Sequence, residues 1–342
     1  MDLNPTEEQQ QLIEAFSAFY AKECPVELVR SAEPSGYDAE LWGRLRAMGV
    51  LDMAVDEASG GWGASLLDLA LVAEQHGRHL GPAPLIEAQV AARLLARSGS
   101  GPSEAALGRA RLPDRLTTLA LHPPRNGTLS LVPAGAVADE VVFMDGDRLL
   151  CMEILEDRRP VSTIGSMPVA DIGVGSPVEL QAGEQARSNF EQARDEWLAL
   201  TANAMVGIGT RSLEIGVAYA KERHAFGVPI GSFQSVAHGL ADAATGVDGS
   251  LLLAREAAWA ASEDRGRATQ LAALACAFSA EAARAASYRS LHYHGGYGFM
   301  LEFDIQLYFR RAKAWPALFG EPAIMYARAA ADRLSTSSAG VR

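Results

Sequence analysis

Residues 219–234 read YAKERHAFGVPIGSFQ, and this stretch closes a long helical pattern. Upstream, largely apolar side chains recur at intervals of three, four or seven residues, which is the spacing of one helix face. This stripe consists of Trp197, Thr201, Ala204, Ile208, Ile215 and Tyr219. Gly207 and Gly209 lie in the same pattern and would let a neighbouring helix approach closely. We therefore expect a long helix that ends at Arg223 and packs against other helices.

Helical patterns continue to the end of the chain, over residues 251–261, 269–292 and 324–334. Together with the helix before Arg223 they predict a C-terminal four-helix bundle that occupies residues 185–342.

The N-terminal part, residues 1–111, is also predicted to be a helical domain. Asn4-Pro5-Thr6-Glu7 is a helix-start pattern ahead of an apolar stripe, and further helices are expected over 39–48, 66–80 and 88–96. Gly49 follows the second of these and is expected to end it. The loop 57–63 is too rich in glycine to be helical.

Between them, residues 112–184 have short β-branched runs broken by Pro, Gly and Asn. Strands are expected over 116–121 and 129–132, and a hairpin is expected to pair 141–144 with 149–154 across Asp145-Gly146-Asp147. The prediction is a small middle β domain, a reduced barrel or sandwich, within a mainly α protein.

The composition excludes some classes of function. The formal net charge is -12, with 42 Asp and Glu against 30 Lys and Arg, so nucleic acid is not an expected partner. The three cysteines, Cys24, Cys151 and Cys276, form no metal-binding spacing, and we expect neither a metal site nor a disulfide framework. No stretch is long and apolar enough for a membrane span, which favours a cytoplasmic protein.

Several short motifs together resemble the acyl-CoA dehydrogenase family. In the N-terminal part they are WGRL at 42–45, MGVL at 48–51 and SGGWG at 59–63. In the C-terminal part they are YAKERHAFG at 219–227, IGSFQ at 230–234, LAD at 240–242 and HGGYG at 294–298. The resemblance implies an FAD-dependent enzyme that removes a proton from the α carbon of an acyl-CoA thioester and passes a hydride from the β carbon to the flavin.

The resemblance also implies the residues that hold FAD across a subunit interface, namely Arg223, Phe226, Gln234, His292, Gly295 and Gly296. The chemistry of these residues agrees with that role. Glycines without a Cβ let backbone N–H groups approach a diphosphate, and a guanidinium offers it a fork of donors. His292 stands where a glutamine is common in the family, and it can still donate one hydrogen bond.

The catalytic base is missing from both positions that the family uses. Most members place a glutamate where this chain has Phe319, and others place it at the position of Trp197, followed by an arginine where this chain has Leu198. The weak candidates for a displaced base are Glu321 and Glu196. Glu196 adjoins the second position, but one residue on a helix rotates a side chain by about 100°.

The segment that holds the flavin ring in the family is also replaced, because residues 119–126 read LALHPPRN and lack its polar side chains. The adenosine-side motifs remain while the flavin cradle and the base are absent. The chain therefore resembles the smaller, base-lacking subunit of heteromeric α2β2 actinobacterial acyl-CoA dehydrogenases. This implies a larger homologous subunit as partner, an acyl-CoA from fatty-acid or steroid side-chain β-oxidation as substrate, and an electron-transfer partner.

Two alternatives stay open at this point. The chain could be a self-sufficient homo-oligomeric acyl-CoA dehydrogenase with a displaced base at Glu321 or Glu196. It could also be a flavin-free structural or regulatory homologue that keeps only the fold.

Overall fold

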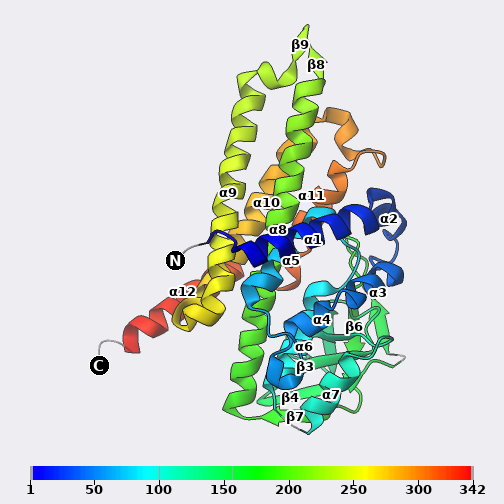
Figure 1. Ribbon diagram of the computed structural model, residues 1–342, viewed down its shortest axis with the longest axis vertical. Coiled ribbons are helices and arrows are strands. Elements are labelled where there is room, and N and C mark those ends of the chain that lie inside the picture. Colours follow the sequence, from blue (N-terminus) through cyan, green and yellow to red (C-terminus); the bar gives the residue numbers. More distant parts are fainter. Residues whose placement is uncertain (1–2, 100, 156, 340–342) are drawn as a thin grey trace. The chain divides into compact units, whose positions relative to one another are not determined.

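The computed structural model describes residues 3–99, 101–155 and 157–339, apart from the side chains of 335–339 (Figure 1). The chain divides into two compact units. The helical unit contains residues 1–26, 70–81 and 198–342, and the mixed unit contains residues 27–69 and 82–197. The three-part division expected from the sequence, at 1–111, 112–184 and 185–342, stays a prediction.

The helical unit contains α1 (Glu7–Glu23), the second part of α5 (Leu66–His79), most of α8 (Glu184–Glu222), α9 (Gln234–Glu263), α10 (Arg265–Tyr293), α11 (Ile305–Ala314) and α12 (Pro322–Ala339). A two-stranded hairpin, β8 (His224–Ala225) and β9 (Val228–Pro229), joins the long helices α8 and α9 together with the 3-10 turn η2 (Ile230–Ser232) (Figure 1). Two further 3-10 turns, η3 (Gly295–Phe299) and η4 (Pro316–Leu318), flank α11.

Small residues set the spacing between these helices. A Cβ added at Gly207 would collide with the backbone oxygen of Glu74 in α5, and one at Gly209 would lie 3.1 Å from Val247 of α9 and 3.4 Å from Ala283 of α10. The expected close approach at both glycines is therefore confirmed. α10 is rich in buried alanines, whose short side chains bring neighbouring backbones near each other.

The mixed unit begins with short helices and ends in two sheets. Its helical elements are α2 (Val26–Ser31), α3 (Ala39–Ala47), α4 (Val50–Ala54), η1 (Glu57–Ser59), the first part of α5, α6 (Leu85–Arg97), α7 (Pro102–Ala110) and the start of α8. Its strands are β1 (Thr117–Leu119), β2 (Thr128–Val132), β3 (Glu140–Asp145), β4 (Arg148–Glu153), β5 (Arg158–Pro160), β6 (Ala170–Gly173) and β7 (Val178–Ala182).

The strands form a four-stranded sheet of order β1-β3-β4-β7 and a three-stranded sheet of order β2-β6-β5. The predicted hairpin is confirmed, because β3 pairs with β4 antiparallel and Asp145 faces Arg148 at the turn. Gly146 takes a φ of +64° in that turn. The chain passes between the two sheets after β1, β2, β4 and β6.

The fold class is confirmed as mainly α with a small β domain. Several short elements were not predicted, namely α2, α4, α7, α11 and the strands β5, β6 and β7. α9 also begins 17 residues before the predicted 251, at Gln234. The polar and small residues near the start of α9 hide its helical period, and tertiary contacts with α10 supply the missing stabilisation.

Candidate functional site

The bundle tip, residues 223–234, holds three of the proposed FAD residues in one connected segment of the helical unit (Figure 1). The backbone N–H of Arg223 donates to Tyr219 O at 2.8 Å, and its carbonyl accepts from Ile230 N at 2.8 Å. The backbone at Arg223 is thus fixed while its side chain is exposed. This arrangement presents a guanidinium to whatever binds at the tip.

Phe226 occupies an unusual position in the hairpin turn. It has a φ of +55° and Gly227 has one of +83°, so both turn residues are left-handed, as in a type I′ turn. Such a turn favours Asn, Asp or Gly at its first position, and a phenylalanine there is strained. The ring is nevertheless 97% exposed, with its edge contact to Phe233 at 6.2 Å between centroids. The chain's own packing does not explain this residue.

Gln234 is the first residue of α9 and is exposed. Phe233, at the N-cap, gives no side-chain hydrogen bond to the first turn. Val236 N and Ala237 N donate to Phe233 O at 3.0 Å, and the preceding N–H groups of Gln234 and Ser235 can donate to an anionic or carbonyl group from outside.

The glycine turn, residues 294–298, is the second part of the site. Gly295 has a φ of +62°, which favours glycine, and an added Cβ at Gly298 would collide with Leu291 O. Gly296 has neither reason, since its φ is ordinary and an added Cβ would meet no described atom within 4 Å. An open backbone of this kind is suited to close approach by a ligand or partner.

Contacts tie the glycine turn to the bundle tip. The ring of His294 stacks on Tyr219 at 3.9 Å, one turn before Arg223, and Tyr293 Oη donates to Ser235 O at 3.3 Å, next to Gln234. Burial lowers the pKa of His294, although its hydrogen bond with Ser290 O opposes this. His292 is exposed on the last turn of α10, with its ring 5.8 Å from that of Tyr288. These contacts bring the proposed residues to one end of the helical unit.

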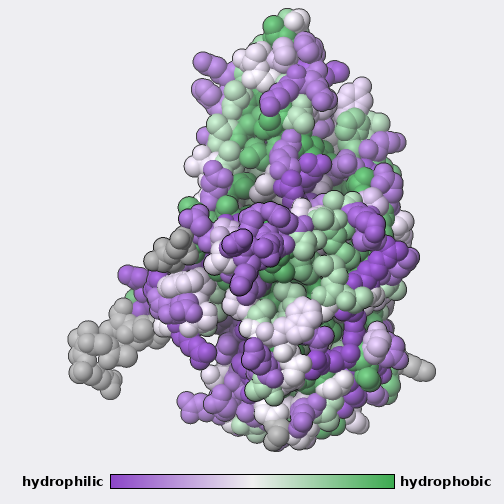
Figure 2. Space-filling model, in the orientation of Figure 1, coloured by the Kyte–Doolittle hydropathy of each residue, from purple (hydrophilic) through white to green (hydrophobic). Residues whose placement is uncertain are grey.

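The tip and the segment 297–301 of the helical unit both expose large apolar side chains. Exposed large apolar residues of the helical unit include Val228, Tyr297, Phe299, Met300 and Leu301 in addition to Phe226. Hydrophobic residues are visible at the end of the molecule where β8 and β9 lie (Figure 2). Exposed apolar residues grouped in this way are typical of a protein–protein contact.

The two base positions of the family are filled by buried aromatic side chains. Phe319 is 3% exposed, with the guanidinium of Arg328 6.0 Å from its ring centre. Trp197 is 1% exposed, and its Nε1 donates to Glu87 Oε1 at 3.4 Å. Neither group accepts a proton, and each is held by contacts inside its own unit.

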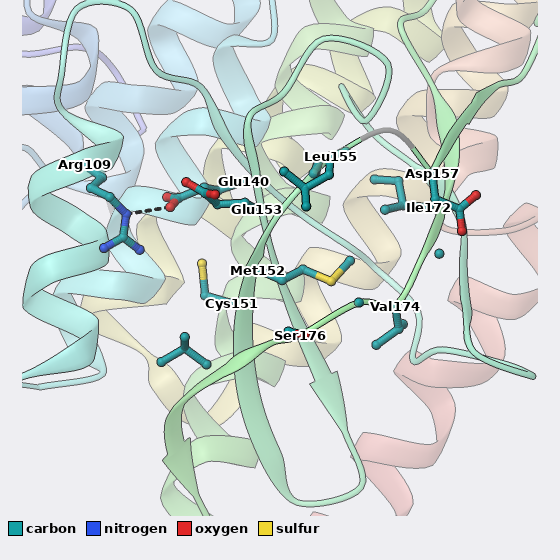
Figure 3. A pocket seen from close by; sticks show the side chains of 14 residues that line it. Arg109, Glu140, Cys151, Met152, Glu153, Leu155, Asp157, Ile172, Val174 and Ser176 are labelled. Atoms are coloured by element: carbon teal, nitrogen blue, oxygen red, sulfur yellow. Dashed lines mark hydrogen bonds and ion pairs between the residues drawn. The ribbon is translucent and has the colours of Figure 1, made fainter.

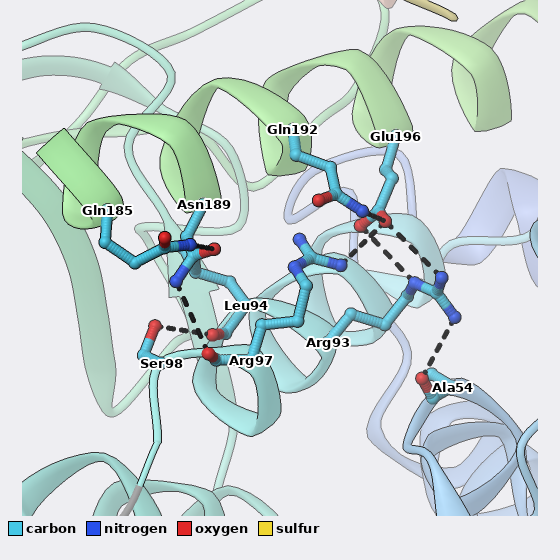
Figure 4. Close-up of polar contacts among 9 residues, drawn as sticks. All are labelled: Ala54, Arg93, Leu94, Arg97, Ser98, Gln185, Asn189, Gln192 and Glu196. Atoms are coloured by element: carbon cyan, nitrogen blue, oxygen red, sulfur yellow. Dashed lines mark hydrogen bonds and ion pairs between the residues drawn. The ribbon is translucent and has the colours of Figure 1, made fainter. Parts of the chain in front are cut away.

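Glu196 lies in a buried ion cluster between α6 and the start of α8, which we call the Glu196 cluster: Arg93, Arg97, Gln192 and Glu196 (Figure 4). Arg97 Nη1 lies 2.7 Å from Glu196 Oε1, and Arg93 Nε lies 3.3 Å from Oε2. Burial raises the pKa of the Glu196 carboxyl, but the guanidiniums of Arg97 and Arg93 outweigh it, and the net pKa is lowered. A carboxylate held this way is a weak proton acceptor.

The sequence analysis did not single out Arg93 and Arg97. Arg97 lies one residue beyond the helix predicted over 88–96, and only the observed α6, which includes it, places Arg93 and Arg97 on one face at a spacing of four residues. Glu321, the other candidate base, is exposed and directly precedes α12, and its carbonyl accepts from Ile324 N at 2.9 Å.

Among the described residues, no group of three or more His, Cys, Asp or Glu side chains could hold a metal ion. In the same part of the chain, no helix has the length and hydropathy needed to cross a membrane.

Comparison with known proteins agrees with this architecture. Residues 184–334 match the model of the acyl-CoA dehydrogenase C-terminal domain, and residues 6–103 match that of the N-terminal domain. The acyl-CoA dehydrogenase IpdE2 of Mycolicibacterium smegmatis is 30% identical over 321 residues, which cover 93% of this chain and 96% of that protein. The chain belongs to the acyl-CoA dehydrogenase family.

Two further relatives come from Mycobacterium tuberculosis. The acyl-CoA dehydrogenase FadE27 is 28% identical over 348 residues, covering 92% of this chain and 93% of that protein. The crystal structure of the ChsE4-ChsE5 complex contains a chain that is 26% identical with a TM-score of 0.87, covering 98% of this chain and 99% of that one. The Tcur3481-Tcur3483 steroid acyl-CoA dehydrogenase shares the fold, at 24% identity and a TM-score of 0.87, covering 97% of this chain and 99% of that one.

Family membership assigns an oxidoreductase fold whose cofactor is FAD. The structure fits one end of that cofactor. An exposed guanidinium, an uncapped helix N-terminus and the unexplained Gly296 are groups that suit a diphosphate and its neighbouring sugar.

Proposed function

We propose that this chain is the smaller, base-lacking subunit of a heteromeric FAD-dependent acyl-CoA dehydrogenase, acting in the cytoplasm on a fatty-acyl or steroid side-chain CoA thioester. The observation that carries the proposal is the contrast between the two kinds of family position. Phe319 and Trp197, at the base positions, are buried in the chain's own packing, whereas Phe226 and Gly296, at the FAD positions, face outward.

In this proposal the chain binds and orients FAD at its adenosine and diphosphate end. Arg223 supplies a forked donor, the first N–H groups of α9 beside Gln234 supply backbone donors, and His292 donates one hydrogen bond. Gly295 and Gly296 leave room for the backbone to approach the cofactor. FAD itself supplies the acceptor for the substrate's hydride.

The base and the flavin cradle come from a larger homologous subunit. The chain offers no carboxylate at Phe319 or Trp197, and the α-proton of a thioester needs a positioned base. The exposed Phe226 ring and the apolar residues near it provide a surface for such a partner. The ChsE4-ChsE5 complex, whose name gives two proteins, contains a chain similar to this one and supports the proposal of a second subunit. Electrons would leave through a separate electron-transfer partner.

The test is co-expression of this chain with a larger homologous subunit from the same organism. Alone, the purified chain should be nearly colourless and should not dehydrogenate acyl-CoA with an artificial electron acceptor. The co-purified complex should be yellow and active. A yellow, active preparation of this chain alone would overturn the proposal.

A second candidate is a self-sufficient homo-oligomeric enzyme with Glu321 as its base. The observation that favours it is that Glu321 is exposed and directly follows Gly320, which has a φ of +142°. Glu321→Gln and Glu196→Gln variants of the chain alone, assayed with the same acceptor, separate this candidate from the first. Lost turnover in the Glu321→Gln variant would support it, and unchanged turnover in both variants would remove it.

A flavin-free scaffold is the remaining alternative. Arg223→Ala in the assembled complex tests it, because flavin content should fall if the guanidinium contacts FAD. Unchanged flavin content would favour the scaffold.

A further inference from the structure

The β domain contains a hollow with a volume of about 650 Å³ (Figure 3). Its lining holds the guanidinium of Arg109 and three carboxylates, those of Glu140, Glu153 and Asp157. Arg109 Nε lies 2.6 Å from Glu140 Oε1, and Arg115 Nη2 lies 2.9 Å from Glu153 Oε1. Charged groups of the chain therefore already pair with one another there, and we assign no ligand to this hollow.

The exterior face of α10, in the helical unit, has an unusual composition. Five side chains recur along it at intervals of four, three, four and three residues, so they lie on one narrow face of the helix. We call this face the α10 stripe: Leu274, Phe278, Glu281, Ala285 and Tyr288. Four of the five are apolar or aromatic, whereas the outer face of a helix usually carries charged and polar residues. The stripe therefore resembles a contact surface.

The stripe is open to solvent along most of its length. Phe278 is 37% exposed, Tyr288 is 50% exposed, and Ala285 between them is also exposed. The opposite side of α10 is buried within the helical unit, with side chains that include Cys276, Ala283, Ser287 and Ser290. The structure thus leaves aromatic rings uncovered on a helix whose other side is already packed.

α9 and α12 border the stripe without covering it. A Cβ added at Gly249 of α9 would lie 3.4 Å from the Phe278 ring, and Tyr326 Oη of α12 donates to Glu281 Oε2 at 2.8 Å. Leu252 lies three residues after Gly249 on α9, is 57% exposed and extends the apolar surface next to Phe278. These contacts hold Phe278 and Glu281 in place along the stripe.

The charges on α10 favour one kind of partner for the stripe. Glu281 is its one ionisable carboxylate, and the exposed Arg284 has no ion partner among the residues that the structure describes. If two copies of the stripe met with their helices parallel, the two Glu281 carboxylates would face each other, which is unfavourable. With the helices antiparallel, each Glu281 faces Ala285 of the other copy and lies within reach of that copy's Arg284.

We propose that the α10 stripe binds the α10 stripe of a second copy of this chain, with the two helices antiparallel about a twofold axis between Glu281 and Ala285. A twofold axis makes each contact occur twice. Phe278 of each copy then faces Tyr288 of the other, which forms an aromatic pair on either side of the axis. None of the proposed FAD residues lies in the stripe, so this inference does not depend on the proposed function.

Sedimentation velocity of the full chain, alone and in the proposed complex, tests this surface. The unchanged chain should form a dimer, and the complex should contain two copies of it. Ala285→Asp places a carboxylate opposite Glu281 of the other copy and should raise the dissociation constant of the dimer by about tenfold or more. Phe278→Asp should do the same, because it removes the aromatic pair.

Leu131→Asp is the matched control, because it adds the same charge at a position that is 41% exposed in the β domain. It should leave the dissociation constant unchanged. A chain that stays monomeric, in a complex that holds one copy of it, would overturn the proposal. Equal weakening of the dimer by Leu131→Asp and Ala285→Asp would also overturn it.

Mixed pairs of differently tagged chains test the antiparallel arrangement. A chain with Ala285→Asp should bind a chain with Glu281→Gln about as tightly as two unchanged chains bind, because the new carboxylate then meets a neutral amide. It should bind the unchanged chain about threefold to tenfold more weakly. Glu281→Gln keeps an oxygen that can accept from Tyr326 Oη. Equal binding to both chains would contradict the antiparallel arrangement.

Flavin content of the complex separates this inference from the proposed function. The Phe278→Asp complex should lose its second copy of this chain while its flavin content per larger subunit stays the same, because the proposed FAD residues are unchanged. An Ala285→Asp chain that still dimerises but no longer retains the larger subunit would assign the stripe to that subunit and overturn the second copy as its partner. A colourless complex would contradict the proposed function and leave the result on the dimer as it stands.

Discussion

The bundle tip and the Glu196 cluster occupy opposite extremes of exposure and charge pairing. At the tip, Phe226 places an apolar ring in solvent on a strained turn, and in the glycine turn a Cβ added to Gly296 would meet no described atom within 4 Å. In the cluster, Glu196 is 2% exposed and is held by two guanidiniums from α6. The turn at Phe226 is strained and its ring is exposed. The charged side chains near the family's second base position instead pair with one another inside the mixed unit. In the proposed complex the tip would contact other molecules, whereas the charged side chains of the Glu196 cluster pair with one another.

The largest expected effect comes from breaking the closed region. Glu196→Ala leaves two largely buried guanidiniums without their anion, and we expect a loss of about 3–5 kcal/mol in the free energy of unfolding. Urea denaturation measures it. Glu40→Ala, which removes an exposed helix pair with Arg44, is the control and should cost less than about 1 kcal/mol. Equal losses in both variants would mean that the buried ion pairs of Glu196 contribute no more to stability than an exposed pair.

The pH dependence sharpens the same comparison. The pKa of Glu196 is lowered in the folded state by Arg97 and Arg93 against the effect of burial. A carboxyl with a depressed folded pKa contributes stability above its unfolded pKa of about 4.3, and this is lost as pH falls through the lower folded pKa. Stability of the unchanged chain should therefore fall more steeply below about pH 4 than that of Glu196→Gln. Parallel curves from denaturation at several pH values would contradict the assigned shift.

Two glycines of the glycine turn, Gly296 and Gly298, allow the effects on packing and on binding to be measured separately. Gly298→Ala should destabilise the chain by about 1–3 kcal/mol, because its Cβ would collide with Leu291 O. Gly296→Ala should leave stability within about 0.5 kcal/mol, because the added methyl group meets open space. In the assembled complex, however, Gly296→Ala should lower flavin content. Thermal melts and flavin absorbance of the two variants make the distinction, and unaltered flavin in the Gly296 variant would weaken the proposed role.

The smallest expected effect has an unusual sign. Phe226→Asn places a residue suited to the left-handed turn and should stabilise the isolated chain by about 0.5–1 kcal/mol. The same change removes an apolar contact and should weaken assembly with the larger subunit. Denaturation of the chain alone and co-purification with the partner measure the two sides. A variant that is stabler and assembles normally would show that the ring has no partner.

The sequence predicted what periodicity and local chemistry encode. The long stripe ending at Tyr219, the end of a helix at Gly49 and the Asp145–Arg148 hairpin all appear in the structure, because each depends on residues close in the chain. Strands β5 and β6 were not predictable in this way. β5 has the sequence RRP and β6 the sequence ADIG, and neither has the alternation of a strand without the pairing that holds it.

The candidate site was predictable only by resemblance. A lone arginine near a helix end, or a pair of glycines, does not by itself predict a binding site. Arg223 and Gly296 were predicted as FAD residues because the motifs around them resemble those of the family. The Glu196 cluster depends on α6 and α8, about a hundred residues apart, and no local signal joins Glu196 to Arg97. Exposure of Phe226 is likewise a tertiary property, because a phenylalanine in a sequence is expected to be buried.

The Phe226 turn also separates two kinds of constraint on this protein. A ring that is 97% exposed adds almost nothing to the stability of its own chain, so a screen for folded protein would accept Asn, Asp or Gly at this left-handed position. If Phe226 contacts the larger subunit as proposed, a screen for assembled enzyme would reject these residues. Substitutions at position 226 therefore allow effects on folding of the chain and effects on assembly of the complex to be measured separately.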